Sequence, residues 1–170
     1  FVLDEENGLI KSSESNGTKV SVIYRPTDIR VYQEIGNKVV GNETLDSLRR
    51  NYSNYYYFVL SLSQDNKEAL HNGRSVSNYT ELLEIMSFEM DRVVTLTTAS
   101  KDTIPVGDFM INRTFGFSSS TDLLFAFSKK NEKNSPDWIQ FNLNEFGLGT
   151  GNQRFRFLTK ELEEAPKLKF

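Results

Sequence analysis

The sequence predicts an α+β fold, with a predominantly antiparallel sheet of six to eight strands and two or three helices packed on one face. Between residues 108 and 159, apolar and polar residues alternate in one short segment after another, which is the pattern of strands buried on one face. These segments follow one another too closely for parallel crossovers, which need about a dozen residues each. Residues 78–91 instead repeat apolar side chains at the helical period.

In chain order, the first predicted elements are a strand and a helix. Residues 19–25 alternate in the strand pattern, and Pro26 ends the strand. Residues 27–35 fit either a helical stripe or a strand. We favour the helix, with Gly36 as its stop.

The next predicted elements are a short amphipathic helix and a strand. The helix begins at Asn42, which we expect to cap it, and its apolar stripe runs to Tyr52. Residues 55–63 are the clearest strand of the first half of the chain. Among them Tyr56 and the alternate apolar residues after it are expected to point inward.

The strongest predicted helix covers residues 78–91 and starts with a capping-box-like pair, Asn78 and Glu81. Its wide apolar stripe indicates that it is buried against the sheet. Residues 93–98 are β-branched and strand-like. From Lys160 the tail predicts a helical turn and then an extended end. Four further strands lie at residues 109–112, 122–128, 138–143 and 154–157.

We expect one folded domain over residues 18–170, preceded by residues 1–17 as a tether or a frayed hairpin. The chain of 170 residues is 38% apolar and 25% charged, which is typical of a globular domain. Its net charge of −3 argues against a nucleic-acid partner. No apolar run approaches the ~20 residues of a membrane-spanning helix, so we expect no spanning segment.

The sequence points to no cofactor and no catalytic group. It has no cysteine, which excludes disulfides, thiolate metal sites and cysteine nucleophiles. Its one histidine, His71, has neither the partners of a zinc site nor a serine on a nucleophile elbow. Gly147, Gly149 and Gly151 precede a strand rather than a helix, so they indicate a turn and not a phosphate loop. The many carboxylates leave an acid/base hydrolase as an alternative.

Aromatic residues at outward strand positions are the candidate binding residues. Tyr55 and Tyr57 alternate with the inward residues of their strand, and Trp138 shares an outward face with amide side chains. Tyrosine and tryptophan are enriched at binding hot spots. We therefore predict a contact surface made of Tyr55, Tyr57 and Trp138, with Arg154 and Arg156 as its polar rim.

Three stretches of the chain resemble a known group of proteins. They are residues 24–26 (YRP), 137–147 (DWIQFNLNEFG) and 151–157 (GNQRFRF). Together they resemble uncharacterised exported proteins, often lipoproteins, of Bacteroidota-type bacteria. The resemblance carries no activity or site residues. It implies a location in the cell envelope, periplasmic or at the surface, with a lipid anchor on a leader cysteine outside this chain.

These observations lead to one functional expectation and two alternatives. We expect a non-enzymatic cell-envelope domain that binds a protein partner, in a surface assembly for example. The first alternative is a carbohydrate-binding module that stacks a glycan on the same aromatic residues. The second is the acid/base hydrolase.

Overall fold

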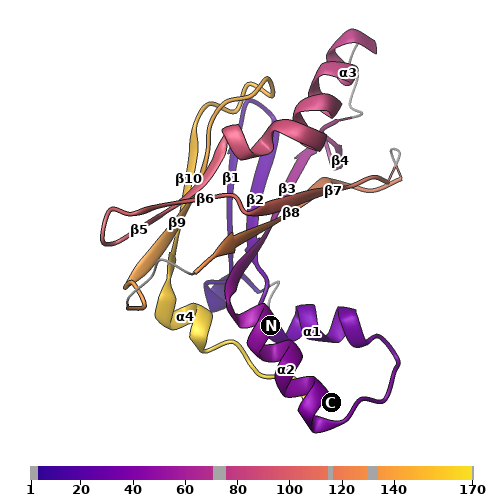
Figure 1. Ribbon diagram of the computed structural model, residues 1–170. Helices are drawn as coiled ribbons and strands as arrows, with labels where there is room; N and C mark the ends of the chain where they lie inside the picture. The colour runs from indigo at the N-terminus through magenta and orange to yellow at the C-terminus, as the bar shows by residue number, and fades with distance from the viewer. Residues whose placement is uncertain (1–3, 71–75, 115–116, 130–133, 170) are drawn as a thin grey trace.

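The computed structural model describes residues 4–70, 76–114, 117–129 and 134–169 (Figure 1). Over these residues, ten strands form two antiparallel sheets, and four α-helices accompany them. The α+β class and the antiparallel pairing are therefore confirmed.

The larger sheet has the strand order β1-β2-β3-β8-β7, and the short β4 pairs with the end of β3. β3 is central because its ten residues pair with β2 on one side and with β8 and β4 on the other. Its inward positions are buried, as the alternation predicts. The strands are β1 (Ile10–Ser15), β2 (Thr18–Tyr24), β3 (Tyr55–Gln64), β4 (Lys67–Glu68), β7 (Asp108–Asn112) and β8 (Thr121–Ser128).

The smaller sheet has the strand order β10-β9-β5-β6. Its central strands β9 and β5 pair in antiparallel register, with Phe141 opposite Leu96. Both side chains are fully buried, so one face of this sheet is also apolar. The strands are β5 (Val94–Thr98), β6 (Thr103–Pro105), β9 (Trp138–Leu143) and β10 (Gln153–Leu158).

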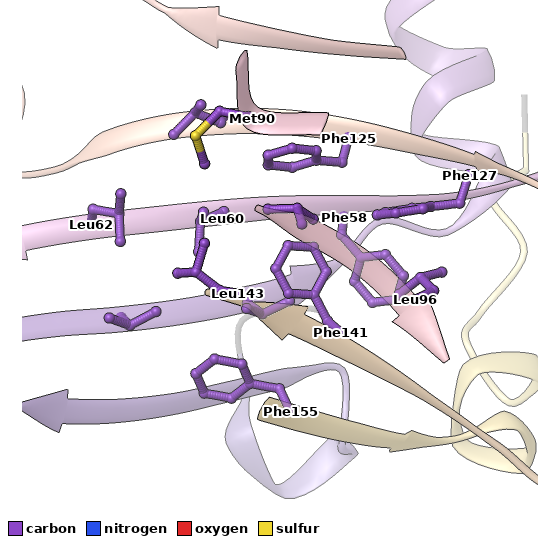
Figure 2. Close-up of a cluster of buried hydrophobic side chains, with 14 of the residues drawn as sticks. Phe58, Leu60, Leu62, Met90, Leu96, Phe125, Phe127, Phe141, Leu143 and Phe155 are labelled. Atoms are coloured by element: carbon purple, nitrogen blue, oxygen red, sulfur yellow. The ribbon is translucent and has the colours of Figure 1, made fainter. Parts of the chain in front are cut away.

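The two sheets pack face to face, and their inward phenylalanines make the core (Figure 2). From the smaller sheet, the Phe141 ring lies 5.7 Å from the rings of both Phe58 and Phe125 in the larger sheet. Phe58 is also 5.2 Å from Phe157, centroid to centroid. These are distances of edge-to-face and tilted aromatic packing, which adds to the hydrophobic stabilisation of the core.

The sequence predicted one sheet of six to eight strands with helices on one face, and here the structure differs. The four strands between residues 108 and 159 are two hairpins that lie in different sheets, β7–β8 in the larger and β9–β10 in the smaller. Each sheet buries its apolar face mainly against the other. Alternation records that a strand has one buried face, but it does not record what covers that face.

The helices lie mainly at the ends of the sheets (Figure 1). α1 (Thr27–Ile35) and α2 (Asn42–Ser53) contact each other at one end, and α4 (Thr159–Glu163) follows β10 towards the same end. The predicted helix over 27–35 and the helical turn after Lys160 are thus confirmed. The helical region α3 (Val76–Glu84) lies near the other end, and it continues through a π-helix (Ile85–Glu89) and a 3-10 turn (Met90–Arg92).

The predicted helix over 78–91 is confirmed, and Met86 and Met90 are fully buried in the core. Both predicted caps are wrong. The helix already begins at Val76, so Asn78 is inside its first turn. Asn42 is likewise the first helical residue, and the cap position before it is Gly41, without a side-chain hydrogen bond.

Of the two alternatives for the first 17 residues, a tether or a frayed hairpin, the structure has a hairpin, and its first strand is fully paired with β2. A 3-10 turn (Glu5–Asn7) leads into β1, whose six residues all pair with β2 in a hairpin. The Ser13 hydroxyl donates a 2.7 Å hydrogen bond to Gln153 in β10, which ties this edge to the second sheet. β1 is an edge strand, and its polar and charged side chains discourage pairing of the open edge with another chain.

The connection between β9 and β10 is built around the carboxylate of Glu145. The backbone N–H groups of Gly147, Gly149 and Gly151 donate to it at 2.8, 2.8 and 2.6 Å, and all three glycines have positive φ. The prediction of a glycine turn rather than a phosphate loop agrees with this arrangement. Burial pushes the pKa of Glu145 upward, but these backbone bonds and one from Thr150 outweigh it and leave the pKa below its usual value.

Replacing Glu145 with Gln should lower the free energy of unfolding at neutral pH by about 1–2 kcal/mol, since charge-assisted bonds in an exposed loop are lost. A lowered folded-state pKa means that the carboxylate stabilises the fold above its unfolded-state pKa and stops doing so as pH falls through the folded-state value. Urea unfolding at neutral and acidic pH measures both effects. The difference between wild type and variant should close in acid, and the exposed control Glu84→Gln should show no such gap. A gap independent of pH would contradict the role of the charge.

Candidate functional site

The outward positions of the smaller sheet form one continuous surface, which we call the Trp138 face. Cross-strand pairs place Leu158 beside Trp138, Arg156 beside Gln140 and Arg154 beside Asn142. On the other side of β9, the threonines of β5 continue the same rows. The Trp138 face consists of Thr95, Thr97, Thr103, Pro105, Trp138, Gln140, Asn142, Arg154, Arg156 and Leu158.

At one side of this face, Arg156 lies over the ring of Trp138. The guanidinium carbon is 3.7 Å from the ring centroid, which is a close cation–π contact. The same guanidinium donates to the side-chain oxygen of Gln140 at 3.2 and 3.3 Å. Trp138 is half-buried and Arg156 exposed. The stack therefore presents a flat, pre-positioned cation and an indole edge at the surface.

A row of amide and hydroxyl side chains continues from the stack across the sheet. The amide of Gln140 donates to Asn142 at 2.9 Å, and Asn142 in turn donates to the hydroxyls of Thr97 and Thr95 at 3.2 and 3.3 Å. Side chains held by one another lose little rotational freedom when a partner binds, so less of the binding energy is spent on ordering them.

The Trp138 face is positively charged although the chain is negative. Its ten described positions include two arginines, Arg154 and Arg156, and no carboxylate. Both arginines are exposed, and Leu158 beside them is 49% exposed. A cation, an aromatic edge and an exposed aliphatic group thus lie side by side on this face.

Sequence reasoning placed five residues on one contact surface, and the structure divides them. Trp138, Arg154 and Arg156 lie together on the Trp138 face. Tyr55 and Tyr57 lie on the outward face of the larger sheet, which points in the opposite direction because the sheets pack face to face. A single surface of all five residues is therefore wrong.

Tyr57 is also less accessible than an outward position suggests, because only 7% of it is exposed. Its ring is 6.0 Å from the ring of Tyr52 in α2, and the guanidinium of Arg30 in α1 lies 5.4 Å from its centroid. Burial, partly offset by the charge of Arg30, raises the pKa of the Tyr57 phenol. The two helices thus cover Tyr57, and Tyr55 remains half-buried beside it at 6.1 Å.

The sequence placed the amide residues Gln140 and Asn142 on the face of Trp138 but did not predict them as binding residues, and Leu158 was missed. Gln140 and Asn142 hold the arginine and the threonines in place, and Leu158 supplies exposed apolar surface. The signal that finds them is simple, because residues two apart on one strand share a face. Only the tertiary structure shows that β5 pairs with β9 and adds its threonines to this face.

The remaining chemistry is sparse in the described part of the chain. No group of three or more potential metal ligands gathers among these residues. His71 lies outside the described residues. Nor does any helix of the described ranges combine the length and apolar character needed to cross a membrane. Comparison of the chain with protein-family models, with curated proteins and with solved structures finds no match.

Proposed function

We propose that the chain is a non-enzymatic binding domain that takes a protein partner on the Trp138 face. The observation that carries the proposal is the stack of Arg156 on Trp138, which Gln140 holds in position. Tryptophan and arginine are the residue types most enriched among binding hot spots. Here both are pre-positioned on a rigid sheet rather than on a mobile loop.

The same stack favours a protein over a glycan as the ligand. A sugar that stacks on tryptophan needs an open ring face, whereas the Arg156 guanidinium lies over the Trp138 ring at 3.7 Å. A glycan on that ring face would have to displace the guanidinium and break its bonds to Gln140. A protein carboxylate instead binds the free edge of a stacked guanidinium without moving it.

The charge of the face indicates the chemistry of the partner. Arg154 and Arg156 have no carboxylate beside them on the face, so an acidic partner surface with an apolar centre would complement them. We place the interaction in the cell envelope because of the resemblance of residues 137–147 and 151–157 to exported proteins. The sequence of the full gene product tests this location. An export leader that ends in a lipidation cysteine supports it, and a full-length sequence without any export signal contradicts it.

Replacing Trp138 with Ala should weaken binding of the partner by about 2 kcal/mol or more, roughly 30-fold in Kd, while the protein remains folded. The loss follows from removing both the indole and the support of Arg156. Partners are captured from envelope proteins of the producing organism and then titrated against each variant. Phe88→Ala is the matched control, because Phe88 is 76% exposed and lies outside the Trp138 face.

Capture that is lost in Trp138→Ala and Arg156→Gln but kept in Phe88→Ala supports the proposal. Thermal unfolding of each variant checks that the fold is intact. Unchanged capture of partners by Trp138→Ala would contradict the proposal that they bind at the Trp138 face. A glycan array run in parallel separates the ligand classes, because a saturable sugar signal that Trp138→Ala abolishes would assign the face to carbohydrate instead.

A further inference from the structure

A cavity of about 540 Å³ lies at the end of the sandwich where α1, α2, α4 and the C-terminal tail meet. This volume is within the range of small-molecule sites. Its lining comes from segments far apart in the sequence, including Tyr24 of β2, Arg50 of α2, Leu162 of α4 and Lys167 of the tail. It shares no residue with the Trp138 face.

The inner part of the cavity is aromatic and apolar. Tyr24 and Tyr56 are both buried, and Leu162 of α4 is buried beside them. Burial, and then the nearby carboxylate of Glu163, raises the pKa of Tyr24 to about 12.

One wall of the cavity is held in place by a buried carboxylate. Asp28 accepts two hydrogen bonds from Arg49, at 2.8 and 3.0 Å, and one from the backbone N–H of Leu168 at 2.8 Å. Arg49 donates to the carbonyl of Leu168 at 2.9 Å. The tail is thus fastened to α1 and α2 through the backbone N–H and C=O of one residue, Leu168. The cavity is preformed, so a ligand does not have to order its walls.

The described lining residues of the cavity have a formal excess of one positive charge. They include four cations and three carboxylates. Arg49 compensates Asp28, and the ammonium group of Lys129 lies 4.4 Å above the Tyr56 ring. The cations are Arg49, Arg50, Lys129 and Lys167, and the carboxylates are Asp28, Asp46 and Glu163.

We propose that this cavity binds a small organic monoanion, an apolar body that carries one carboxylate. The apolar part packs among Tyr24, Tyr56 and Leu162, and the carboxylate lies at the mouth near Arg50 and Lys167. A single negative charge balances the lining, whereas a cation would add to the existing excess. The aromatic floor favours an apolar body, since a bare inorganic anion would contact only the cations at the mouth and leave the floor without a partner.

Three probes with the same ring and different charge test the proposal: phenylacetate, its neutral analogue phenylacetamide, and the cation phenethylamine. Heteronuclear NMR titration should show saturable shifts with phenylacetate at α2, α4 and the tail, weaker shifts with the amide, and none with the amine. No saturable shift with phenylacetate, equal binding of the amine, or shifts elsewhere on the protein would overturn the proposal.

Variants at the mouth of the cavity separate recognition of the ligand's charge from non-specific hydrophobic binding. Arg50→Gln combined with Lys167→Gln should weaken the binding of phenylacetate by about tenfold. Both residues are exposed, so the fold should persist, and thermal unfolding checks this. The control Lys160→Gln removes an exposed cation of α4 that does not line the cavity and should bind as wild type. An unchanged affinity in the double variant would contradict the proposed anion site. It would not bear on the separate proposal that a partner binds the Trp138 face.

Discussion

Replacing Phe58 with Ala should lower the free energy of unfolding by about 3–5 kcal/mol, the range of large-to-small changes in well-packed cores. Phe58 is fully buried at the centre of β3. Its ring lies 5.5 Å from Tyr24, 6.1 Å from Phe127 and 5.7 Å from Phe141. The substitution removes ring contacts to both sheets at once, and the neighbouring rings cannot collapse into the space without moving a whole sheet (Figure 2).

Urea unfolding followed by circular dichroism measures this loss. Phe58→Leu keeps most of the volume and should cost less than about 1.5 kcal/mol. Phe88→Ala removes the same side chain from an exposed position and should stay within about 0.5 kcal/mol of wild type. A loss in Phe58→Ala no larger than in Phe88→Ala would mean that the two sheets do not share this core.

Replacing Asp28 with Ala should cost about 2–3 kcal/mol and release the C-terminal tail. The carboxylate is buried and accepts three hydrogen bonds, so its removal leaves Arg49 and the Leu168 amide without their acceptor. Breaking a fully buried ion pair costs more, about 3–5 kcal/mol. The side chain of Arg49 is 30% exposed, however, and can turn to water.

Hydrogen exchange at the Leu168 amide reports the release directly. We expect its protection to fall at least about tenfold in Asp28→Ala, because its acceptor is gone. Asp46→Ala is the control, since Asp46 is an exposed carboxylate of α2 that also lines the cavity and acts on Arg49 only through its charge. Its unfolding and exchange should match wild type. Protection that survives in Asp28→Ala would show that the tail is held by other contacts.

Local patterns in the chain were sufficient for most of the individual elements. The alternation in 138–143 and 154–157 predicted β9 and β10, and the helical stripe in 78–91 predicted the region that begins with α3. The caps failed at Asn42 and Asn78 because a local pattern places a helix end only to within one or two residues, and both asparagines lie inside the helices that they were expected to cap.

The Trp138 face was predicted in part. Trp138 and the arginines of β10 were found because outward aromatic and cationic residues stand out in strands with this alternation. The prediction that they share one contact surface with Tyr55 and Tyr57 was wrong, because an outward position can belong to either sheet. A helix can also cover such a position, as α1 and α2 cover Tyr57. The cavity was missed because its lining comes from segments as distant as Tyr24 and Lys167.

The sequence by itself determined that this protein is an antiparallel α+β domain, and it determined which side of most strands is buried. Both follow from periodicity, which acts between neighbours along the chain. Only the tertiary structure decided that the strands divide into two facing sheets, that Arg156 stacks on Trp138, and that Asp28 holds the tail across the cavity. These features depend on contacts between distant segments, and a local pattern contains no information about which distant surface will meet it.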